Sequence, residues 1–135
     1  MAETFHLSLL TPERSILETE IVSMVAPGTE GYLGVLAYHA PLITALRPGK
    51  LTVRHSEHET STYAVSGGFL EISDNRATIL ADAVESPDEI DLERAKRARE
   101  RALERLRDLS GRYDAARAEA ALQRALNRIR IAESS

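Results

Sequence analysis

The sequence has no cysteine and no tryptophan, and aromatic residues make up only 4% of its 135 residues. The absence of cysteine excludes disulfide bonds, thiol catalysis and cysteine-ligated metal sites, and it leaves the redox compartment open. With so few aromatic rings, the hydrophobic core must be aliphatic. Proteins that read nucleic acid by stacking bases on aromatic side chains are therefore disfavoured, and the net charge of −4 argues in the same direction.

Long apolar runs are absent too, since no stretch approaches the ~18 residues that a membrane-spanning helix needs. The first ten residues lack the basic start and the apolar segment of a secretory signal peptide, so we expect a cytoplasmic protein. Lysine is scarce, because only Lys50 and Lys96 are lysine among the 17 basic residues. Arginine suits bidentate contact with carboxylate or phosphate groups, although a GC-rich genome would give the same bias.

Residues 1–86 show the two-residue period of β-strands. Phe5, Leu7 and Leu9 alternate with polar residues, and a β-branched stretch runs from Ser15 to Ala26. A turn is predicted at 47–50, a bend at 66–68 and a hairpin turn at 74–75. Turns that recur roughly every ten residues predict a β-sandwich or a barrel. This first part carries 5 basic and 11 acidic residues.

Residues 87–135 show the helical period instead and carry 12 basic and 10 acidic residues. Ser86 to Glu89 fits a capping box, and Asp91 is a second candidate N-cap. Apolar residues recur at spacings of three and four on both sides of a break at Ser110-Gly111, namely Ala95, Ala98, Ala102, Leu106 and Leu109, then Ala115, Ala118, Leu122, Ala125 and Ile129. The pattern predicts an antiparallel helical hairpin.

The predicted seam of this hairpin consists mostly of alanine. Each alanine buries little apolar area, at about 25 cal/mol per Å², so the two helices would be held together weakly. An element of low local stability can be displaced at small cost, which fits a switch. A plain structural hairpin fits the sequence equally well.

Signatures of catalytic and metal sites are missing. His55 and His58 flank a polar loop without further converging ligands, so we interpret them as a solvated hairpin tip. His39 has no nucleophile pattern near it and is interpreted as a structural histidine. The glycine-rich stretch 28–34 lacks the following helix and the lysine of a phosphate-binding loop. We therefore predict no catalytic residue, no metal and no required cofactor.

The predicted hairpin also gathers arginines on shared helix faces, with Arg94 and Arg101 on the first helix and Arg124 and Arg128 on the second. If the hairpin folds on itself, these guanidinium groups could converge. Such groups repel one another unless an anion lies between them, and a nucleotide triphosphate would serve as that anion. Asp91 and Glu85 lie at the open end of the hairpin. The alternative is that each arginine pairs with a local carboxylate, as Arg97 could with Glu93.

Several stretches along almost the whole chain together resemble one family. They are GYLGVL at 31–36 with HAPLI at 39–43, SGGFLE at 66–71, TILA at 78–81, IDLERA at 90–95 and RALNR at 124–128. In this order, they resemble the epsilon subunit of the bacterial F-type ATP synthase. The resemblance implies a ten-stranded N-terminal β-sandwich, residues 1–86, followed by a regulatory helical hairpin, residues 87–135.

The resemblance implies a non-catalytic central-stalk subunit that joins gamma to the ring of membrane c-subunits. It places the chain in the F1 sector, peripherally on the cytoplasmic face of the bacterial membrane. It also implies a brake, in which the hairpin extends toward the alpha and beta subunits and inhibits ATP hydrolysis. In some members, ATP acts as a regulatory ligand that holds the hairpin folded. No nucleic-acid partner is implied.

The resemblance further assigns residues to these contacts. The ATP-contacting positions carry over to Glu85, Asp91, Arg94, Arg101, Arg124 and Arg128. Contacts with the rotor and the c-ring are expected from Glu30, Tyr32 and His39. Contact with an acidic segment of beta is expected from Arg112, Arg117, Arg124 and Arg128.

Two positions depart from the family pattern. Tyr32 stands where many members have an acidic residue, and Tyr38 stands where glycine or asparagine is common. Glu30 could substitute for the acidic group, or the contact with the c-ring could be apolar. Two other functions compete with the rotor subunit, namely a free-standing ATP-binding sensor and a β-sandwich adaptor with a passive helical arm.

Overall fold

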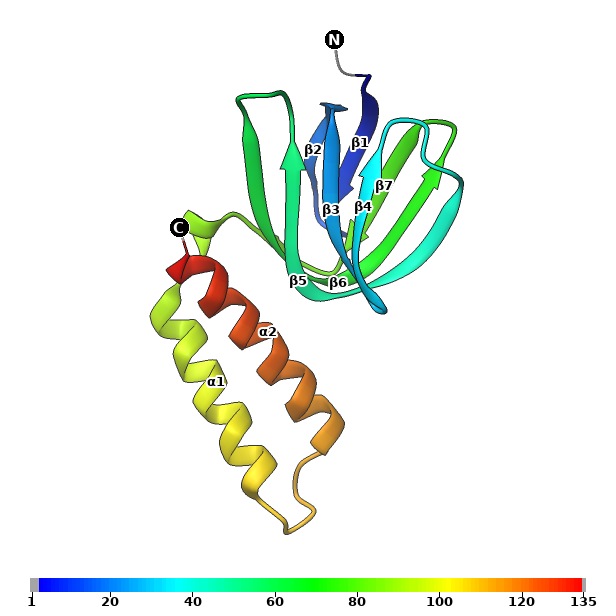
Figure 1. Ribbon diagram of the computed structural model, residues 1–135. Helices are drawn as coiled ribbons and strands as arrows, with labels where there is room; N and C mark the ends of the chain where they lie inside the picture. Colours follow the sequence, from blue (N-terminus) through cyan, green and yellow to red (C-terminus); the bar gives the residue numbers. More distant parts are fainter. Residues whose placement is uncertain (1–2, 135) are drawn as a thin grey trace. The chain divides into compact units, whose positions relative to one another are not determined.

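The computed structural model describes residues 3–134 (Figure 1). The strands are β1 (Phe5–Leu10), β2 (Ser15–Ile21), β3 (Ser23–Gly28), β4 (Gly31–Leu36), β5 (Leu42–Arg54), β6 (Thr60–Ser73), β7 (Arg76–Ala81) and β8 (Val84–Glu85). The helices are the 3-10 helix η1 (Pro87–Glu89) and the α-helices α1 (Leu92–Arg107) and α2 (Ala115–Glu133). The chain divides into two compact units, Met1–Glu85 and Ser86–Ser135. The expected plan of a β-sandwich followed by two helices is confirmed.

The strands of the first unit form one continuous sheet that folds over into two layers (Figure 1). The strand order is β2-β1-β7-β6-β5-β3-β4, and β8 pairs with β6. Strands β5 and β6 have 13 and 14 residues and pair along almost their whole length. At one end of this pair, β6 also pairs with β7. At the other end, β5 pairs with β3 and β6 pairs with β8, so the two long strands belong to both layers.

The strand count differs from the expected ten, since the described residues form eight strands. The predicted turn at 47–50 is wrong, because β5 runs through it. Gly49 serves a close approach instead: a Cβ atom there would lie 2.4 Å from Cβ of Pro27 on β3. The stretch from Ser15 to Ala26 is also not one strand. It breaks at Val22, because β2 pairs with β1 whereas β3 pairs with β4 and β5.

The predicted bend at 66–68 and the predicted hairpin turn at 74–75 are confirmed. Gly67 and Gly68 have φ angles of 110° and 131°, which mark the bend inside β6. Asp74 and Asn75 have φ angles of 53° and 58° and form the two-residue turn between β6 and β7. Both turn residues lie in the left-handed region, as the preferred hairpin turn requires.

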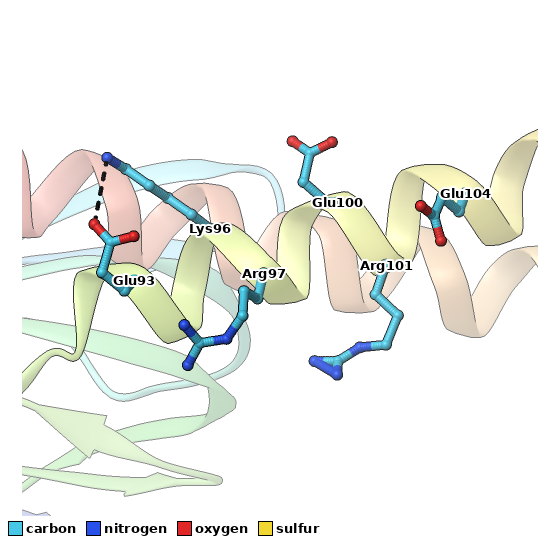
Figure 2. A pocket seen from close by; sticks show the side chains of 6 residues that line it. All are labelled: Glu93, Lys96, Arg97, Glu100, Arg101 and Glu104. Carbon is cyan, nitrogen blue, oxygen red and sulfur yellow. Dashed lines mark ion pairs between the residues drawn. The ribbon is translucent and has the colours of Figure 1, made fainter.

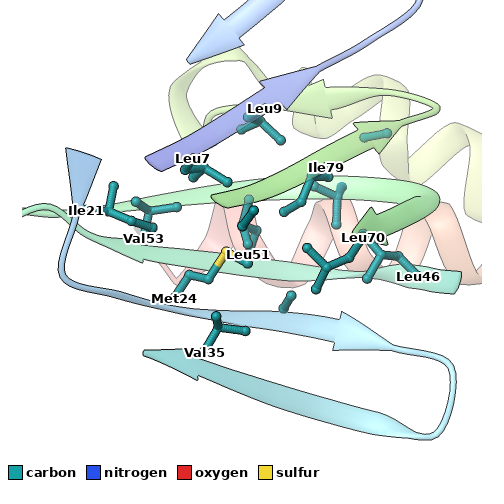
Figure 3. Close-up of a cluster of buried hydrophobic side chains, with 14 of the residues drawn as sticks. Leu7, Leu9, Ile21, Met24, Val35, Leu46, Leu51, Val53, Leu70 and Ile79 are labelled. Carbon is teal, nitrogen blue, oxygen red and sulfur yellow. The ribbon is translucent and has the colours of Figure 1, made fainter. Parts of the chain in front are cut away.

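The core lies between the two layers and is almost wholly aliphatic, as predicted (Figure 3). Its fully buried side chains come from strands of both layers and include Leu7, Leu9, Ile21, Met24, Val35, Leu51, Val53, Leu70 and Ile79. The alternation of buried and half-buried residues along β1 is the pattern that predicted this strand.

The second unit is the predicted helical hairpin. Both candidate caps are used: the Glu89 carboxylate accepts the Ser86 N–H at 2.9 Å before η1, and Asp91 accepts the Arg94 N–H at 3.1 Å at the start of α1. The buried faces of α1 and α2 contain the predicted residues Ala95, Ala102, Ala118, Leu122, Ala125 and Ile129. The predicted seam places of Leu109 and Ala115 are wrong. Leu109 is 94% exposed, because α1 ends at Arg107, and Ala115 is exposed in the first turn of α2.

Candidate functional site

Three large apolar side chains lie exposed side by side on the outside of the sandwich. Ile43 is 73% exposed, Phe69 60% and Leu80 50%. Phe69 of β6 is paired with Leu80 of β7, and Ile43 lies on the adjoining strand β5. These three side chains line a hollow of about 230 Å³ together with Leu70, Glu71 and Thr78. We call Ile43, Phe69 and Leu80 the outer apolar face. Exposed apolar patches of this kind mark protein–protein contacts.

The residues of the outer apolar face were not predicted as site residues, although the sequence contains a signal for them. Phe69 and Leu70 are adjacent and both apolar. Neighbouring strand residues point to opposite faces of a sheet, so one of the two must point away from the core. Leu70 is the buried member, which leaves Phe69 outside.

Glu30 and Tyr32 lie together at the turn between β3 and β4, where a hollow of about 280 Å³ includes both. The Tyr32 hydroxyl accepts the Lys50 N–H at 3.1 Å, and the Arg47 guanidinium lies 5.3 Å from the centre of the Tyr32 ring. Tyr32 is therefore held in place, with one half of its surface exposed. The turn presents one acidic and one aromatic side chain.

His39, the third residue of the predicted rotor contact, lies at the opposite end of β4. It follows the strand, whereas Glu30 precedes it. A strand of six residues spans about 20 Å at ~3.3 Å per residue, so the structure does not bring His39 to the β3–β4 turn. His39 Nδ1 lies 2.7 Å from the carbonyl oxygen of Ala40. This contact agrees with its interpretation as a structural histidine.

The residues of the predicted ATP site lie on several elements. Glu85 ends β8, where it pairs with Ala64 of β6. Asp91 caps α1, and one of its carboxylate oxygens is therefore engaged by the Arg94 N–H. Arg94 and Arg101 lie on α1, and Arg124 and Arg128 on α2.

Arg101 lines a hollow of about 290 Å³ on α1, shown in Figure 2. Arg97 and Arg101 extend on the same side of the helix (Figure 2). The ion pairs along α1 join Lys96 to Glu93 at 4.0 Å and Arg99 to Glu100 at 3.1 Å. The predicted local pair of Arg97 with Glu93 is not among these, since Glu93 faces Lys96.

Arg124 lines a different hollow, of about 430 Å³, at the loop end of the hairpin. Its lining also includes Arg112 and Arg117, so the structure brings together three of the four arginines predicted to contact beta. Arg128 does not line it. Arg105, Tyr113 and Asp114, which sequence reasoning did not single out, also line it, together with Ala118 of the predicted seam. We call this the tip hollow.

The described residues form neither a metal site nor a membrane-spanning helix. Within residues 3–134, no group of three or more histidine, aspartate or glutamate side chains could hold a metal ion. In the same described part of the chain, no helix is long and apolar enough to cross a membrane.

Comparison with known proteins covers both units. Residues 4–87 match the family described as ATP synthase, Delta/Epsilon chain, beta-sandwich domain. Residues 88–133 match the family described as ATP synthase, Delta/Epsilon chain, long alpha-helix domain.

Individual relatives agree with these matches. The ATP synthase epsilon chain of Moorella thermoacetica is 51% identical over 129 residues, covering 96% of this chain and 96% of the relative. That of Desulforamulus reducens is 47% identical over 133 residues, covering 98% and 100%.

Solved structures share the fold. A chain of the Euglena gracilis mitochondrial ATP synthase, in an assembly of OSCP, F1 and c-ring, has a TM-score of 0.83 at 26% identity, covering 92% of this chain and 78% of that one. A chain of the Tetrahymena thermophila mitochondrial ATP synthase has a TM-score of 0.64 at 15% identity. Across residues 4–133, the protein thus belongs to the ATP synthase delta/epsilon family, as an epsilon chain, a non-catalytic subunit of the central stalk.

Proposed function

We propose that this epsilon chain couples rotation of the c-ring to the catalytic head and restrains ATP hydrolysis through its C-terminal hairpin. The observation that carries the first part is the outer apolar face on a sandwich that matches the family from residue 4 to residue 87. An exposed apolar patch in a stalk subunit is typical of a surface that a partner protein covers. The gamma subunit is the partner we propose for this face.

The β3–β4 turn is the second proposed contact. Glu30 and Tyr32 offer the c-ring a carboxylate beside an aromatic ring that is fixed by Lys50 and Arg47. A preorganised side chain loses little conformational entropy on binding. The related Euglena chain comes from an assembly that contains the c-ring, which supports this partner. Through these contacts, the chain would lie peripherally on the cytoplasmic face of the bacterial membrane.

The hairpin is the proposed brake. Its buried seam is rich in alanine, which contributes little apolar area, so separating α1 from α2 costs little. An extended hairpin would reach the alpha and beta subunits. Arg112, Arg117, Arg124 and Arg128 would then contact an acidic segment of beta. Contacts between exposed charges weaken as salt is added, so the inhibition would be salt-sensitive.

ATP is the proposed regulatory ligand of the folded hairpin. Arg94, Arg101, Arg124 and Arg128 would contact its phosphates, because a guanidinium pairs bidentately with phosphate. Glu85 and Asp91 would contact the base or the sugar. A ligand that binds only the folded form stabilises that form by about 2.7 kcal/mol at 100-fold excess over Kd. This free energy is enough to shift the equilibrium between the extended and the folded hairpin, because the seam between α1 and α2 is weak.

The brake is tested by ATP hydrolysis in the assembled synthase with the full chain or with a chain ending at residue 86. We expect faster hydrolysis from the shortened chain and unchanged assembly. Equal rates in the two assemblies would contradict the brake. The quadruple variant Arg112→Ala, Arg117→Ala, Arg124→Ala, Arg128→Ala should behave like the shortened chain if the contact is electrostatic.

Docking is tested separately, by the affinity of the full chain for gamma. Phe69→Ser should weaken the complex by about tenfold or more, since a buried aromatic anchor at an interface is worth more than 1 kcal/mol. Val25→Ser is the matched control, because Val25 is also exposed but lies on β3, outside this face. If both variants bind gamma like the unchanged chain, the outer apolar face is not the docking surface.

A further inference from the structure

The tip hollow concentrates positive charge in a concave site. Arg105 comes from the last turn of α1, Arg112 and Tyr113 from the connecting segment, and Arg117 and Arg124 from α2. Its volume of about 430 Å³ lies within the range of small-molecule sites, roughly 300–1,000 Å³.

The charge of the hollow is poorly compensated from within. Asp114 is the one carboxylate among its lining residues, and its Oδ1 atom accepts the N–H groups of Ala116 and Arg117 at 2.9 and 3.2 Å. Lys96 and Arg99 of α1 form their ion pairs, with Glu93 and Glu100, outside this hollow. Guanidinium groups that face one hollow repel one another unless an anion lies between them.

Part of the hollow is held in place before any ligand binds. The Arg105 guanidinium lies 5.1 Å from the centre of the Tyr113 ring, a cation–π contact that holds it at the rim. The connecting segment has its own hydrogen bonds, from the Ser110 N–H to the Asp108 carboxylate at 2.9 Å and from the Arg112 N–H to the Ser110 hydroxyl at 3.3 Å. These contacts lower the ordering cost of binding at Arg105 and in the connecting segment.

We propose that the tip hollow binds an oligophosphate anion, either inorganic or the phosphate chain of a nucleotide. A compact chain of phosphates presents several charges to one hollow, and each of its groups can accept paired hydrogen bonds from a guanidinium. An acidic peptide would spread its carboxylates along a surface and suits a concave site less well. The bound anion would occupy Arg112 and Arg117, and would thereby compete with the contact to beta proposed above.

The site differs from the ATP site predicted by resemblance. It includes Arg105, Arg112 and Arg117, which that site lacks, and it shares only Arg124 with it. Arg112→Ala, Arg117→Ala therefore tests the tip hollow, whereas Arg94→Ala, Arg101→Ala tests the other site with the same change of charge. Arg112 and Arg117 are exposed, so their removal leaves the buried seam intact, which circular dichroism would check.

The experiment is calorimetric titration of the full chain with inorganic tripolyphosphate, with ATP and with a poly-glutamate peptide. We expect tripolyphosphate to bind the unchanged chain and the Arg94→Ala, Arg101→Ala variant alike. The Arg112→Ala, Arg117→Ala variant should bind it about tenfold or more weakly, because charge-assisted hydrogen bonds are lost. Amide chemical shifts of residues 110–113 should move on addition of tripolyphosphate.

The titrations with ATP show whether the bound anion is inorganic or belongs to a nucleotide. Loss of ATP binding in Arg112→Ala, Arg117→Ala means that a nucleotide also uses the tip hollow. Loss only in Arg94→Ala, Arg101→Ala means that the hollow takes the inorganic anion alone. The proposal is overturned if tripolyphosphate does not bind, if its binding is lost only in Arg94→Ala, Arg101→Ala, or if only the peptide binds. None of these results depends on inhibition of the assembled synthase.

Discussion

The side-chain amide of Asn75 accepts a hydrogen bond from the Tyr38 N–H at 2.7 Å and donates one to the carbonyl oxygen of Thr4 at 3.0 Å. One side chain thereby ties together the β6–β7 turn, the β4–β5 connection and the approach to β1. Tyr38 and Asn75 both have left-handed backbones, with φ of 62° and 58°. Glycine and asparagine adopt this conformation readily, whereas a tyrosine such as Tyr38 rarely does.

Replacing Asn75 should destabilise the sandwich measurably. In Asn75→Ala, both hydrogen bonds are lost and the left-handed turn becomes costly, so we expect the free energy of unfolding to fall by about 1–3 kcal/mol. Asn75→Gly loses the same hydrogen bonds but accepts the backbone conformation, and it should cost less. Urea unfolding of the unchanged chain and of both variants measures the free energies of unfolding to be compared. Equal losses in both variants would mean that the backbone conformation contributes nothing.

Gly68 is the position where the sandwich should tolerate a methyl group least. A Cβ atom there would lie 2.2 Å from the Leu80 carbonyl oxygen, and φ is 131°. Gly68→Ala should therefore lower the free energy of unfolding by about 3 kcal/mol or more. Gly34→Ala is the control, because nothing lies within 4 Å of its Cβ position, and it should change stability by less than about 0.5 kcal/mol. Similar melting of both variants would refute this account of the bend.

The features that sequence reasoning predicted correctly are local ones. The turn at Asp74-Asn75 and the cap at Asp91 depend on residues within a few positions of one another. The wrong predictions concern features that depend on segments far apart in the sequence. Gly49 fits a turn by its local sequence, but the residue that requires glycine there, Pro27, is 22 positions away along the chain. The Val22 break depends on strand partners that periodicity cannot reveal.

The candidate sites show the same division. Residue types and family positions pointed to the arginines, but not to how a hairpin would group them. Arg101 and Arg124 line different hollows, and Arg105 joins Arg124 only because α1 and α2 run antiparallel. Likewise, His39 and Glu30 are close in sequence yet lie at opposite ends of β4, since an intervening strand separates them.

Stability should depend on pH through Glu18. His6 Nε2 lies 2.9 Å from the Glu18 carboxylate, and the Ser8 hydroxyl donates to the same oxygen at 2.8 Å. These hydrogen bonds, from His6 first and Ser8 second, lower the pKa of Glu18 below its ordinary value of 4.5. A carboxyl whose pKa is lower in the folded state stabilises that state above its unfolded pKa, and this stabilisation is lost as pH falls through the folded pKa.

Glu18→Gln should therefore weaken the sandwich slightly at neutral pH and flatten the fall in stability below about pH 4.5. The effect should be small, because exposed ion pairs contribute little. Thermal melting across this pH range measures it. Glu13→Gln, in the loop between β1 and β2, is the control and should retain the slope. An unchanged slope in Glu18→Gln would show that this cluster does not couple folding to pH.

The hairpin seam should be the easiest part of the molecule to loosen. Ala102 is 3% exposed on α1, and a larger side chain there must push against its neighbours. Ala102→Leu should cost about 1–3 kcal/mol of local stability by overpacking. Ala120→Leu, on an exposed position of α2, adds the same atoms without this strain and should change stability by less than about 0.5 kcal/mol.

Amide hydrogen exchange can test the seam, because it reports the free energy of local opening element by element. We expect Ala102→Leu to lower protection in α1 and α2 and to leave β1, β6 and β7 unchanged. If ATP binds only the folded hairpin, 100-fold excess over Kd should restore about 2.7 kcal/mol, close to the amount the substitution removes. Loss of protection in the strands as well would mean that the two units open together, and an independent regulatory hairpin would no longer be tenable.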